Sequence, residues 1–153
     1  MFKTYGLIGE RLGHSMSPFI HEKFFSKTGF SGKYNLFEVK RDNLKDVVKA
    51  LKVLGIKGAN VTLPYKLDIM QYLDELSPEA EKIGAVNTIT ISENKAIGSN
   101  TDYHGFGMTL ENRGIDFRGK VAVILGTGGS SRAVSQYLID NGIGELVFVS
   151  RDC

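Results

Sequence analysis

Short apolar blocks alternate with amphipathic stretches along nearly the whole chain, and this pattern predicts strands and helices in turn. The apolar runs predict strands at about residues 5–8, 34–39, 56–62, 87–92, 96–99, 120–125 and 146–150. Apolar residues at helical spacing predict helices at about residues 17–29, 42–54, 65–73, 78–83, 102–114 and 130–141. This alternation favours an α/β fold with an open, mainly parallel sheet.

Residues that favour the ends of elements occur where the pattern changes. Ser17 and Pro18 predict a helix start, with the serine as N-cap and the proline in the first turn. Asp42 predicts a cap for the next helix, and Asp102 begins a later one. Residues 93–95 predict a hairpin between two strands. The chemistry of these residues thus supports the predicted element boundaries.

The last unit of the pattern is a strand, a glycine-rich turn, a helix and a second strand. Two parallel strands and one helix cannot cover both faces of a sheet. We therefore expect the opening of a second domain that has been cut short. The expected organisation is a first domain over residues 1–101, a connecting helix over 102–118 and the incomplete second domain over 119–153.

Composition and charge exclude several classes of protein. The chain has 153 residues, a formal net charge of +2, 42% hydrophobic and 24% charged residues. These values are typical of globular proteins, and they disfavour disorder and nucleic-acid or membrane partners. No apolar run approaches the ~18 residues of a membrane span, and the N-terminus lacks the apolar core of a signal peptide. With Cys153 as its single cysteine, the chain is expected to be cytoplasmic.

The glycine-rich turn predicts a nucleotide site. It follows a strongly apolar strand and opens a helix, and its residues are Gly126, Thr127, Gly128, Gly129 and Ser130. Glycines at such a turn let backbone N–H groups meet a pyrophosphate at the helix N-terminus. The alternative is an ordinary glycine-rich turn between a strand and a helix.

The end of the following strand predicts which cofactor binds. Ser150, Arg151 and Asp152 lie where a dinucleotide site recognises the ribose. An arginine there accommodates the 2′-phosphate of NADP, whereas an acidic residue binds the free 2′-hydroxyl of NAD. Arg151 comes first, so NADP is favoured, and Asp152 keeps NAD as the alternative. A third interpretation is an Arg–Asp pair in solvent.

Polar side chains also gather where other strands end, and parallel α/β sheets bind ligands at that edge. Ser15, Ser17 and Thr62 supply hydroxyls suited to a small polyhydroxylated or carboxylated substrate. Lys66 and Asp102 form a candidate acid/base pair, in which mutual attraction would hold the lysine. On spacing alone, such a lysine or aspartate is more often a solvated charge or a helix cap than a catalytic group.

The histidines indicate little. His21 is expected to be partly buried beside phenylalanines, and His14 is a candidate for substrate contact in the first polar loop. No histidine or cysteine cluster has metal-ligand spacing, so no metal is expected.

Five segments in this order resemble the shikimate dehydrogenase family. They are residues 13–18 (GHSMSP), 57–66 (KGANVTLPYK), 84–88 (GAVNT), 100–102 (NTD) and 126–133 (GTGGSSRA). The resemblance implies a three-layer α/β/α substrate-binding domain, followed by the first βαβ unit of a Rossmann NADP-binding domain. It also implies that the family's chain continues further, completing the cofactor sheet and returning a helix to the first domain.

The resemblance implies a role for each matching residue. Ser15 and Ser17 would bind the substrate carboxylate, and Thr62, Asn87 and Asp102 the ring hydroxyls. Lys66 would donate and accept the proton in the reversible, NADPH-dependent reduction of 3-dehydroshikimate to shikimate. The residues implied to hold NADP are Gly126, Thr127, Gly128, Gly129, Ser130, Ser150 and Arg151.

The chain departs from the family at Tyr103, where glycine is common, and at Ser150 and Asp152, where Asn and Thr are usual. Three alternatives to a shikimate dehydrogenase remain at this point. They are a quinate/shikimate dehydrogenase of the same family, a non-catalytic shikimate-binding fragment, and another two-domain nucleotide-dependent enzyme. A homo-oligomer through the uncovered sheet edge is a further expectation.

Overall fold

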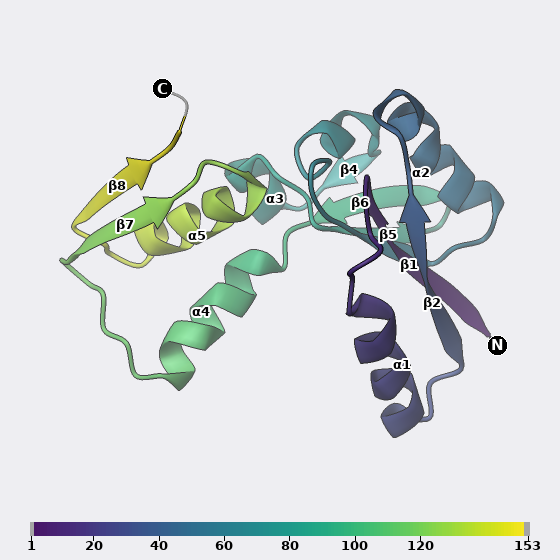
Figure 1. Ribbon diagram of the computed structural model, residues 1–153, viewed down its shortest axis with the longest axis horizontal. Coiled ribbons are helices and arrows are strands. Elements are labelled where there is room, and N and C mark those ends of the chain that lie inside the picture. Colours follow the sequence, from purple (N-terminus) through teal and green to yellow (C-terminus); the bar gives the residue numbers. More distant parts are fainter. Residues whose placement is uncertain (1, 152–153) are drawn as a thin grey trace.

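The computed structural model describes residues 2–151, which form two sheets joined by a helix (Figure 1). The strands are β1 (Lys3–Gly9), β2 (Gly32–Glu38), β3 (Gly58–Val61), β4 (Glu75–Leu76), β5 (Thr88–Ser92), β6 (Lys95–Ser99), β7 (Val121–Leu125) and β8 (Glu145–Val149). The α-helices are α1 (Ser17–Thr28), α2 (Leu44–Val53), α3 (Pro78–Ile83), α4 (Asp102–Asn112) and α5 (Gly129–Asp140), with short 3₁₀ helices η1 (Arg41–Asn43) and η2 (Asp68–Tyr72).

The larger sheet contains six strands in the order β2-β1-β3-β5-β6-β4. Strand β1 pairs in parallel with both β2 and β3, and β4 pairs in parallel with β6. The β5–β6 hairpin pairs antiparallel, as does β3 with β5. The prediction of a mainly parallel sheet is therefore confirmed, with an antiparallel hairpin inserted near one edge.

Helices cover both faces of this sheet, which makes three layers. Neighbouring residues of β1 lie in different cores, because successive side chains of a strand point to opposite faces. Ile8 packs with the buried face of α2, whose Leu44, Val48 and Leu51 are almost fully buried. Leu7 packs with Phe25 of α1 on the other face. The predicted three-layer α/β/α arrangement is therefore confirmed.

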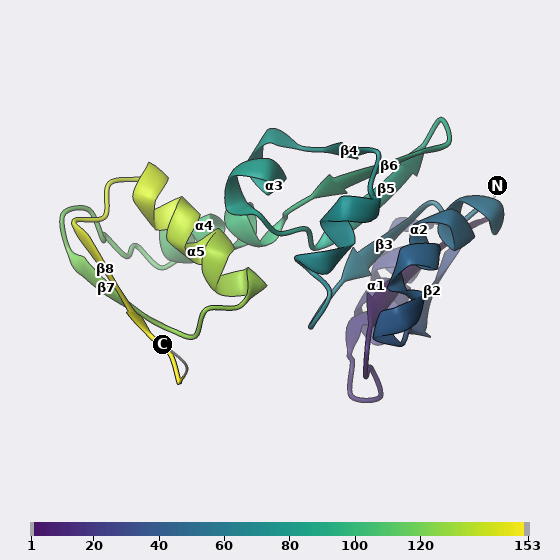
Figure 2. The same cartoon turned by 90° about the horizontal axis from the view of Figure 1, so that it is seen from above.

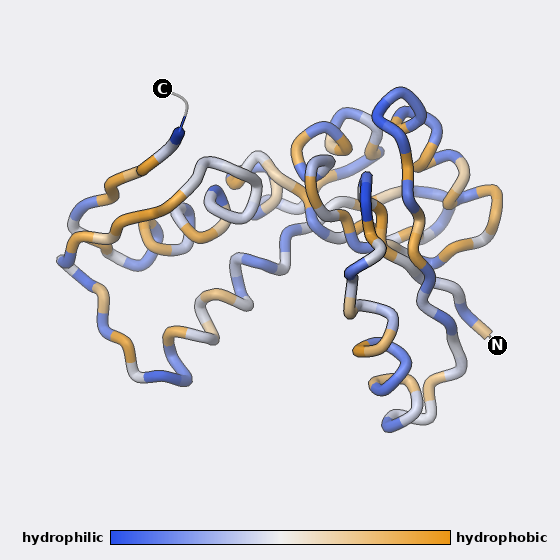
Figure 3. The backbone as a smooth tube through the Cα atoms, in the orientation of Figure 1, coloured by the Kyte–Doolittle hydropathy of each residue, from blue (hydrophilic) through white to orange (hydrophobic). Residues whose placement is uncertain are grey.

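The smaller sheet lies at the opposite end of the molecule from the larger one (Figures 1 and 2). Its two strands, β7 and β8, pair in parallel around α5, which confirms the predicted βαβ unit. The strands form a continuous apolar stretch along the tube (Figure 3), yet most of their side chains are exposed. A small apolar cluster joins the two ends: Ile83 and Ala85 pack with Ala133 of α5.

The predicted helix at residues 65–73 is wrong. Only η2 forms there, and the two-residue strand β4 follows it, where no strand was predicted. The cause is a backbone hydrogen bond: the carbonyl oxygen of Lys66 accepts the N–H of Val86 at 2.7 Å. That carbonyl is therefore engaged outside an α-helical ladder, although buried Tyr65 and Ile69 have helical spacing.

The prediction that Ser17 and Asp42 cap helices is also wrong. Met16 occupies the N-cap position of α1, and Ser17 is already its first helical residue. The N–H of Ser17 donates to the hydroxyl of Ser15 at 3.2 Å, so the earlier serine satisfies it. Asp42 lies within η1, and Asn43 stands at the N-cap of α2 without a side-chain cap.

Within residues 2–151, no helix has both the length and the hydropathy of a membrane span.

Candidate active site

Lys66 and Asp102 form an ion pair where the two ends of the molecule meet. Lys66 lies in the turn after β3, and Asp102 is the first residue of α4. The lysine Nζ is 2.6 Å from Asp102 Oδ2, and the lysine residue is only 8% exposed. The Lys66 side chain is buried, whereas the Asp102 side chain is 34% exposed, so solvent reaches the pair from the carboxylate side and the short contact holds the ammonium in place. The candidate acid/base pair is thus in contact.

Asn87 holds the second oxygen of the carboxylate. Its Nδ2 donates to Asp102 Oδ1 at 2.8 Å and to Thr101 Oγ1 at 3.0 Å. Its Oδ1 accepts the N–H of Thr101 at 2.9 Å. Asn100, which is 3% exposed, accepts the N–H of Asp102 on Oδ1 at 3.0 Å. Both oxygens of Asp102 are therefore engaged and its backbone is fixed.

The glycine-rich turn reaches this pair. The hydroxyl of Ser130, in the first turn of α5, is 3.1 Å from Lys66 Nζ. Gly129 makes the approach possible, because a Cβ there would lie 3.0 Å from Lys66 Cβ and 3.3 Å from Leu67 Cδ1. The predicted nucleotide turn therefore packs directly against the predicted acid/base lysine.

Four further residues of the predicted nucleotide site line one cavity. Gly126, Thr127, Ser150 and Arg151 line a cavity of about 400 Å³ between the ends of β7 and β8. Gly126 has a φ of +100°, a conformation that favours glycine. Asp152, the alternative ribose ligand, lies outside the described residues.

The backbone conformation and the surroundings of Gly128 indicate whether this turn fits a dinucleotide. Its φ is −76°, and a Cβ there would meet no atom within 4 Å. Neither backbone conformation nor packing within the chain therefore requires glycine at this position. The absent side chain leaves the backbone at the N-terminus of α5 open to close approach by an anion, so the turn fits a bound pyrophosphate.

The predicted hydroxyls lie at one edge of the larger sheet. Ser15 and Ser17 follow β1 and Thr62 follows β3, and these strands are parallel neighbours. The N–H of Thr62 donates to the carbonyl of Ile8 at 2.9 Å, which holds the threonine beside the end of β1. Within residues 2–151, no hydrogen bond joins these three residues directly to Lys66 or Asp102.

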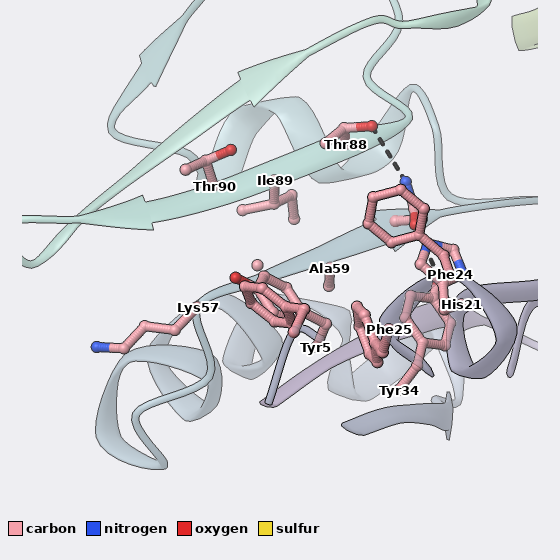
Figure 4. Close-up of a pocket in the computed structure, with 13 residues that line it drawn as sticks. Tyr5, His21, Phe24, Phe25, Tyr34, Lys57, Ala59, Thr88, Ile89 and Thr90 are labelled. Carbon is pink, nitrogen blue, oxygen red and sulfur yellow. Dashed lines mark hydrogen bonds between the residues drawn. The ribbon is translucent and has the colours of Figure 1, made fainter. Parts of the chain in front are cut away.

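A cavity of about 440 Å³ lies between α1 and the larger sheet (Figure 4), and Ser15, Ser17 and Thr62 are not among the residues that line it. Aromatic side chains line much of it, among them Tyr5, Phe24 and Tyr34. Asn60 and Thr88 supply polar groups, and Asn60 Nδ2 donates to Thr88 Oγ1 at 3.2 Å. The cavity is therefore apolar, with polar groups from β3 and β5 in its wall.

Neither His21 nor His14 makes a hydrogen bond to Lys66 or Asp102 within residues 2–151. His21 is partly buried and stacks on Tyr34 with 3.8 Å between ring centroids, as expected of a structural histidine. His14 is exposed in the loop after β1. Among residues 2–151, no group of three or more His, Cys, Asp or Glu side chains is arranged to hold a metal ion.

A family model, the shikimate dehydrogenase substrate binding domain, matches residues 7–89, which is more than half of the chain. The chain belongs to this family. The match spans the larger sheet as far as β5, including Ser15, Ser17, Thr62, Lys66 and Asn87.

Relatives of this family match beyond that segment. The shikimate dehydrogenase (NADP(+)) of Clostridium beijerinckii is 54% identical over 147 residues, which cover 96% of this chain and 54% of the relative. The crystal structure of shikimate dehydrogenase 1 from Peptoclostridium difficile is 48% identical with a TM-score of 0.95, covering 99% of this chain and 57% of that one. The chain spans about half the length of the relatives it matches.

A third relative has its ligands bound. The Thermus thermophilus shikimate 5-dehydrogenase, in complex with NADP(H) and shikimate, is 33% identical with a TM-score of 0.89. The match covers 97% of this chain and 56% of that protein. Both the fold of the larger sheet and the adjoining βαβ unit are therefore family features.

The family departure at Tyr103 has a structural role away from the ion pair. Its hydroxyl donates to Asp140 Oδ2 at 3.0 Å, and its ring meets Tyr137 at 5.2 Å between centroids. Burial raises the pKa of the Tyr103 phenol, and the Asp140 hydrogen bond adds to this. Tyr103 therefore links α4 to α5 and stabilises the packing of these two helices beside the candidate site.

Sequence reasoning missed several contacts around the site. Thr88 and Thr101 bond to Asn87, Asn60 bonds to Thr88, and Tyr34 bonds to Asn60. Asn60 lies within residues 57–66, one of the segments that resemble the family, and this resemblance was the signal that could have identified it. Tyr34 stands within β2, 32 positions before Lys66, and no local pattern relates it to the site.

Proposed function

We propose that this chain carries the substrate-binding half and the start of the cofactor domain of a shikimate dehydrogenase. The reaction is the reversible, NADPH-dependent reduction of 3-dehydroshikimate to shikimate. One observation carries the proposal: Lys66 Nζ contacts both the Asp102 carboxylate and Ser130 of the glycine-rich turn. An acid/base group thus lies between the substrate edge and the cofactor turn, where a hydride transfer needs it.

In the proposed mechanism, Lys66 donates the proton during reduction and accepts it during oxidation. Negative charge develops on the substrate carbonyl oxygen during reduction, and the Lys66 ammonium neutralises it and donates a proton. In the oxidative direction the amine takes the proton of the hydroxyl. Asp102 holds Nζ at 2.6 Å and would orient the same hydroxyl. NADPH, when bound, supplies the hydride.

The substrate contacts are proposed on the same basis. Ser15 and Ser17 would donate hydroxyls to the carboxylate of shikimate, and Thr62 to a ring hydroxyl. Asn87 donates both of its Nδ2 hydrogens within the chain, to Asp102 and Thr101. For Asn87 to contact a ring hydroxyl, as we propose, its Nδ2 would exchange the bond to Thr101 Oγ1 for one to the substrate and keep the bond to Asp102 Oδ1. The Thermus relative, whose structure contains shikimate, supports this substrate class.

For the cofactor, we propose NADP. Gly126, Thr127, Gly128, Gly129 and Ser130 would hold the pyrophosphate at the N-terminus of α5. Arg151 would bind the 2′-phosphate through charge-assisted hydrogen bonds, with Ser150 beside it. The names of the Clostridium relative and of the Thermus complex both include NADP, which favours it over NAD.

The domain boundaries and assembly belong to the same proposal. The substrate-binding domain would span residues 1–101, the connecting helix 102–118 and the start of the cofactor domain 119–153. We place the protein in the cytoplasm, without a metal, nucleic-acid or membrane partner. A homo-oligomer through the open edge of the β7–β8 sheet fits the unpaired backbone groups there.

The test uses a chimeric enzyme in which this chain replaces the matching half of the Clostridium beijerinckii relative. We expect it to oxidise shikimate with NADP, whereas the 153-residue chain alone should turn over little and bind shikimate weakly. Quinate serves as the second substrate and NAD as the second cofactor. A chimera that folds and binds NADP, but neither binds nor oxidises shikimate, would contradict the proposal.

A further inference from the structure

Tyr34 connects the aromatic cavity to the site described above. The residue lies in β2, is 3% exposed, and its ring stacks on His21 with an interplanar angle of 13° (Figure 4). Its hydroxyl donates to Asn60 Oδ1 at 2.7 Å. A buried phenol with both its ring and its hydroxyl engaged has one defined position.

The direction of this hydrogen bond sets the orientation of the Asn60 amide. Because Oδ1 accepts from Tyr34, Nδ2 faces the other way and donates to Thr88 Oγ1 at 3.2 Å. The Thr88 hydroxyl accepts that bond on its oxygen and donates its own hydrogen to Asn87 Oδ1 at 2.9 Å. Each hydrogen bond therefore fixes the orientation of the next group in the series.

The series ends at the catalytic carboxylate. Asn87 Oδ1 accepts from Thr88 and from the N–H of Thr101, so its Nδ2 faces Asp102 Oδ1 at 2.8 Å. A rotated Asn87 amide would place its oxygen against the carboxylate, where both groups are acceptors. The correct orientation leaves Asp102 Oδ2 for Lys66.

We propose that Tyr34 is a positioning residue, whose hydroxyl orients Asn60 and, through Thr88, holds the Asn87 amide toward Asp102. The assignment of these groups to shikimate binding rests on the proposed function, but the orientation itself does not. Tyr34 acts through other residues, since in residues 2–151 no hydrogen bond joins it to Asp102 or Lys66.

The protonation of Tyr34 suits this role. Burial raises the pKa of the phenol to about 12, although a hydrogen bond with the Ser17 side chain lowers it in part. The hydroxyl therefore remains a donor throughout the physiological pH range.

The test is a spectroscopic comparison of two hydroxyl deletions in the 153-residue chain. Tyr34→Phe keeps the ring and removes the donor. Tyr5→Phe is the matched control, because Tyr5 lines the same cavity and its hydroxyl makes no hydrogen bond within residues 2–151. We expect Tyr34→Phe to shift the side-chain amide NMR signals of Asn60 and Asn87, and Tyr5→Phe to leave both in place. Unchanged Asn87 signals in Tyr34→Phe would overturn the proposal.

A binding measurement separates this proposal from the proposed function. If the unmodified chain binds shikimate, Tyr34→Phe should weaken it about three- to tenfold, as expected for one lost hydrogen bond. If the folded chimeric enzyme neither binds nor oxidises shikimate, the proposed function fails, and the amide signals still decide the role of Tyr34. Should Tyr34→Phe not fold, Thr88→Val interrupts the same series, and unchanged Asn87 signals in that variant would contradict the proposal.

Discussion

The two sheets of this molecule are built from similarly apolar strands but differ greatly in burial. In the larger sheet, Ile8 and Ile89 are 0% exposed, because helices cover both faces. In the smaller sheet, Val123 is 60% and Leu125 81% exposed, since α5 covers only one face. An apolar run therefore predicts a strand, whereas its burial depends on elements elsewhere in the chain.

The site lies where these two regions meet, and each contributes a different part of it. The larger region supplies Lys66, Asn87 and the serine loop, all fixed by backbone and side-chain hydrogen bonds. The smaller region supplies the glycine-rich turn, which contacts Lys66 through Gly129 and Ser130. The difference suggests a rigid substrate region and a less supported cofactor region, and four predictions test it.

The largest expected effect is at Lys66. In the chimeric enzyme, Lys66→Ala should lower kcat about 10²–10⁴-fold, because the proton donor and acceptor is lost. Steady-state shikimate oxidation measures it. Lys52→Ala is the control, since Lys52 also pairs with an aspartate, Asp74 at 2.7 Å, but on the outer surface of α2. Equal kcat in the two variants would remove Lys66 from the chemistry.

The second prediction compares the two regions directly by stability. Ile89→Ala should lower the free energy of unfolding by about 2–5 kcal/mol, because it empties part of a closed core. Leu125→Ala should change it by less than about 0.5 kcal/mol, because that side chain already meets solvent. Urea denaturation of the 153-residue chain measures both. Similar losses would mean that the β7–β8 face is covered in solution, as in an oligomer.

The third prediction concerns two adjacent glycines of the cofactor turn. Gly129→Ala should lower the free energy of unfolding by about 1–3 kcal/mol, because its Cβ would press on the Lys66 stem. Gly128→Ala meets no atom within 4 Å and should leave stability unchanged. In the chimeric enzyme, however, Gly128→Ala should raise the KM for NADP. A stable Gly129→Ala variant with normal kinetics would argue against the close contact between the two regions.

The smallest expected effect is the loss of stability at low pH that comes from Asp140, where α5 packs against α4. The hydrogen bond from Lys82 lowers the pKa of Asp140 below its ordinary 3.8, and Tyr103 and Gln136 add to this. The carboxylate therefore stabilises the fold above that pH, and the contribution is lost as the pH falls through the lowered pKa. Asp140→Asn should remove this part of the pH dependence, as measured by thermal unfolding between pH 3 and pH 6. A variant with an unchanged profile would exclude Asp140 as its source.

Much of the fold could be predicted because its elements depend on local patterns. The βαβ unit, the β5–β6 hairpin and the helix beginning at Asp102 were all predictable from periodicity and turn residues. Strand β4 has only two residues, too few for any period to appear. The predicted helix at residues 65–73 failed because Val86, 20 positions after Lys66, takes a backbone acceptor that a helix would need.

The candidate site shows the same limit. The Lys66–Asp102 pair could be proposed from charge and order along the chain. The contact of Ser130 with Lys66 could not, because it depends on how α5 packs against the turn after β3. The Tyr34–Asn60 hydrogen bond joins residues 26 positions apart on strands β2 and β3, which are separated by β1. Such contacts follow from the assembled sheet rather than from any local pattern.

The larger sheet is expected to supply the shikimate contacts of this chain without β7 and β8, so that the chain alone binds shikimate, although weakly. An NMR titration of the 153-residue chain with shikimate tests it most directly. The account predicts saturable shifts of the backbone amides of Asn87, Thr88 and Thr101, with the amides of β7 and β8 unmoved. No shifts in a folded chain, or shifts confined to β7 and β8, would contradict it.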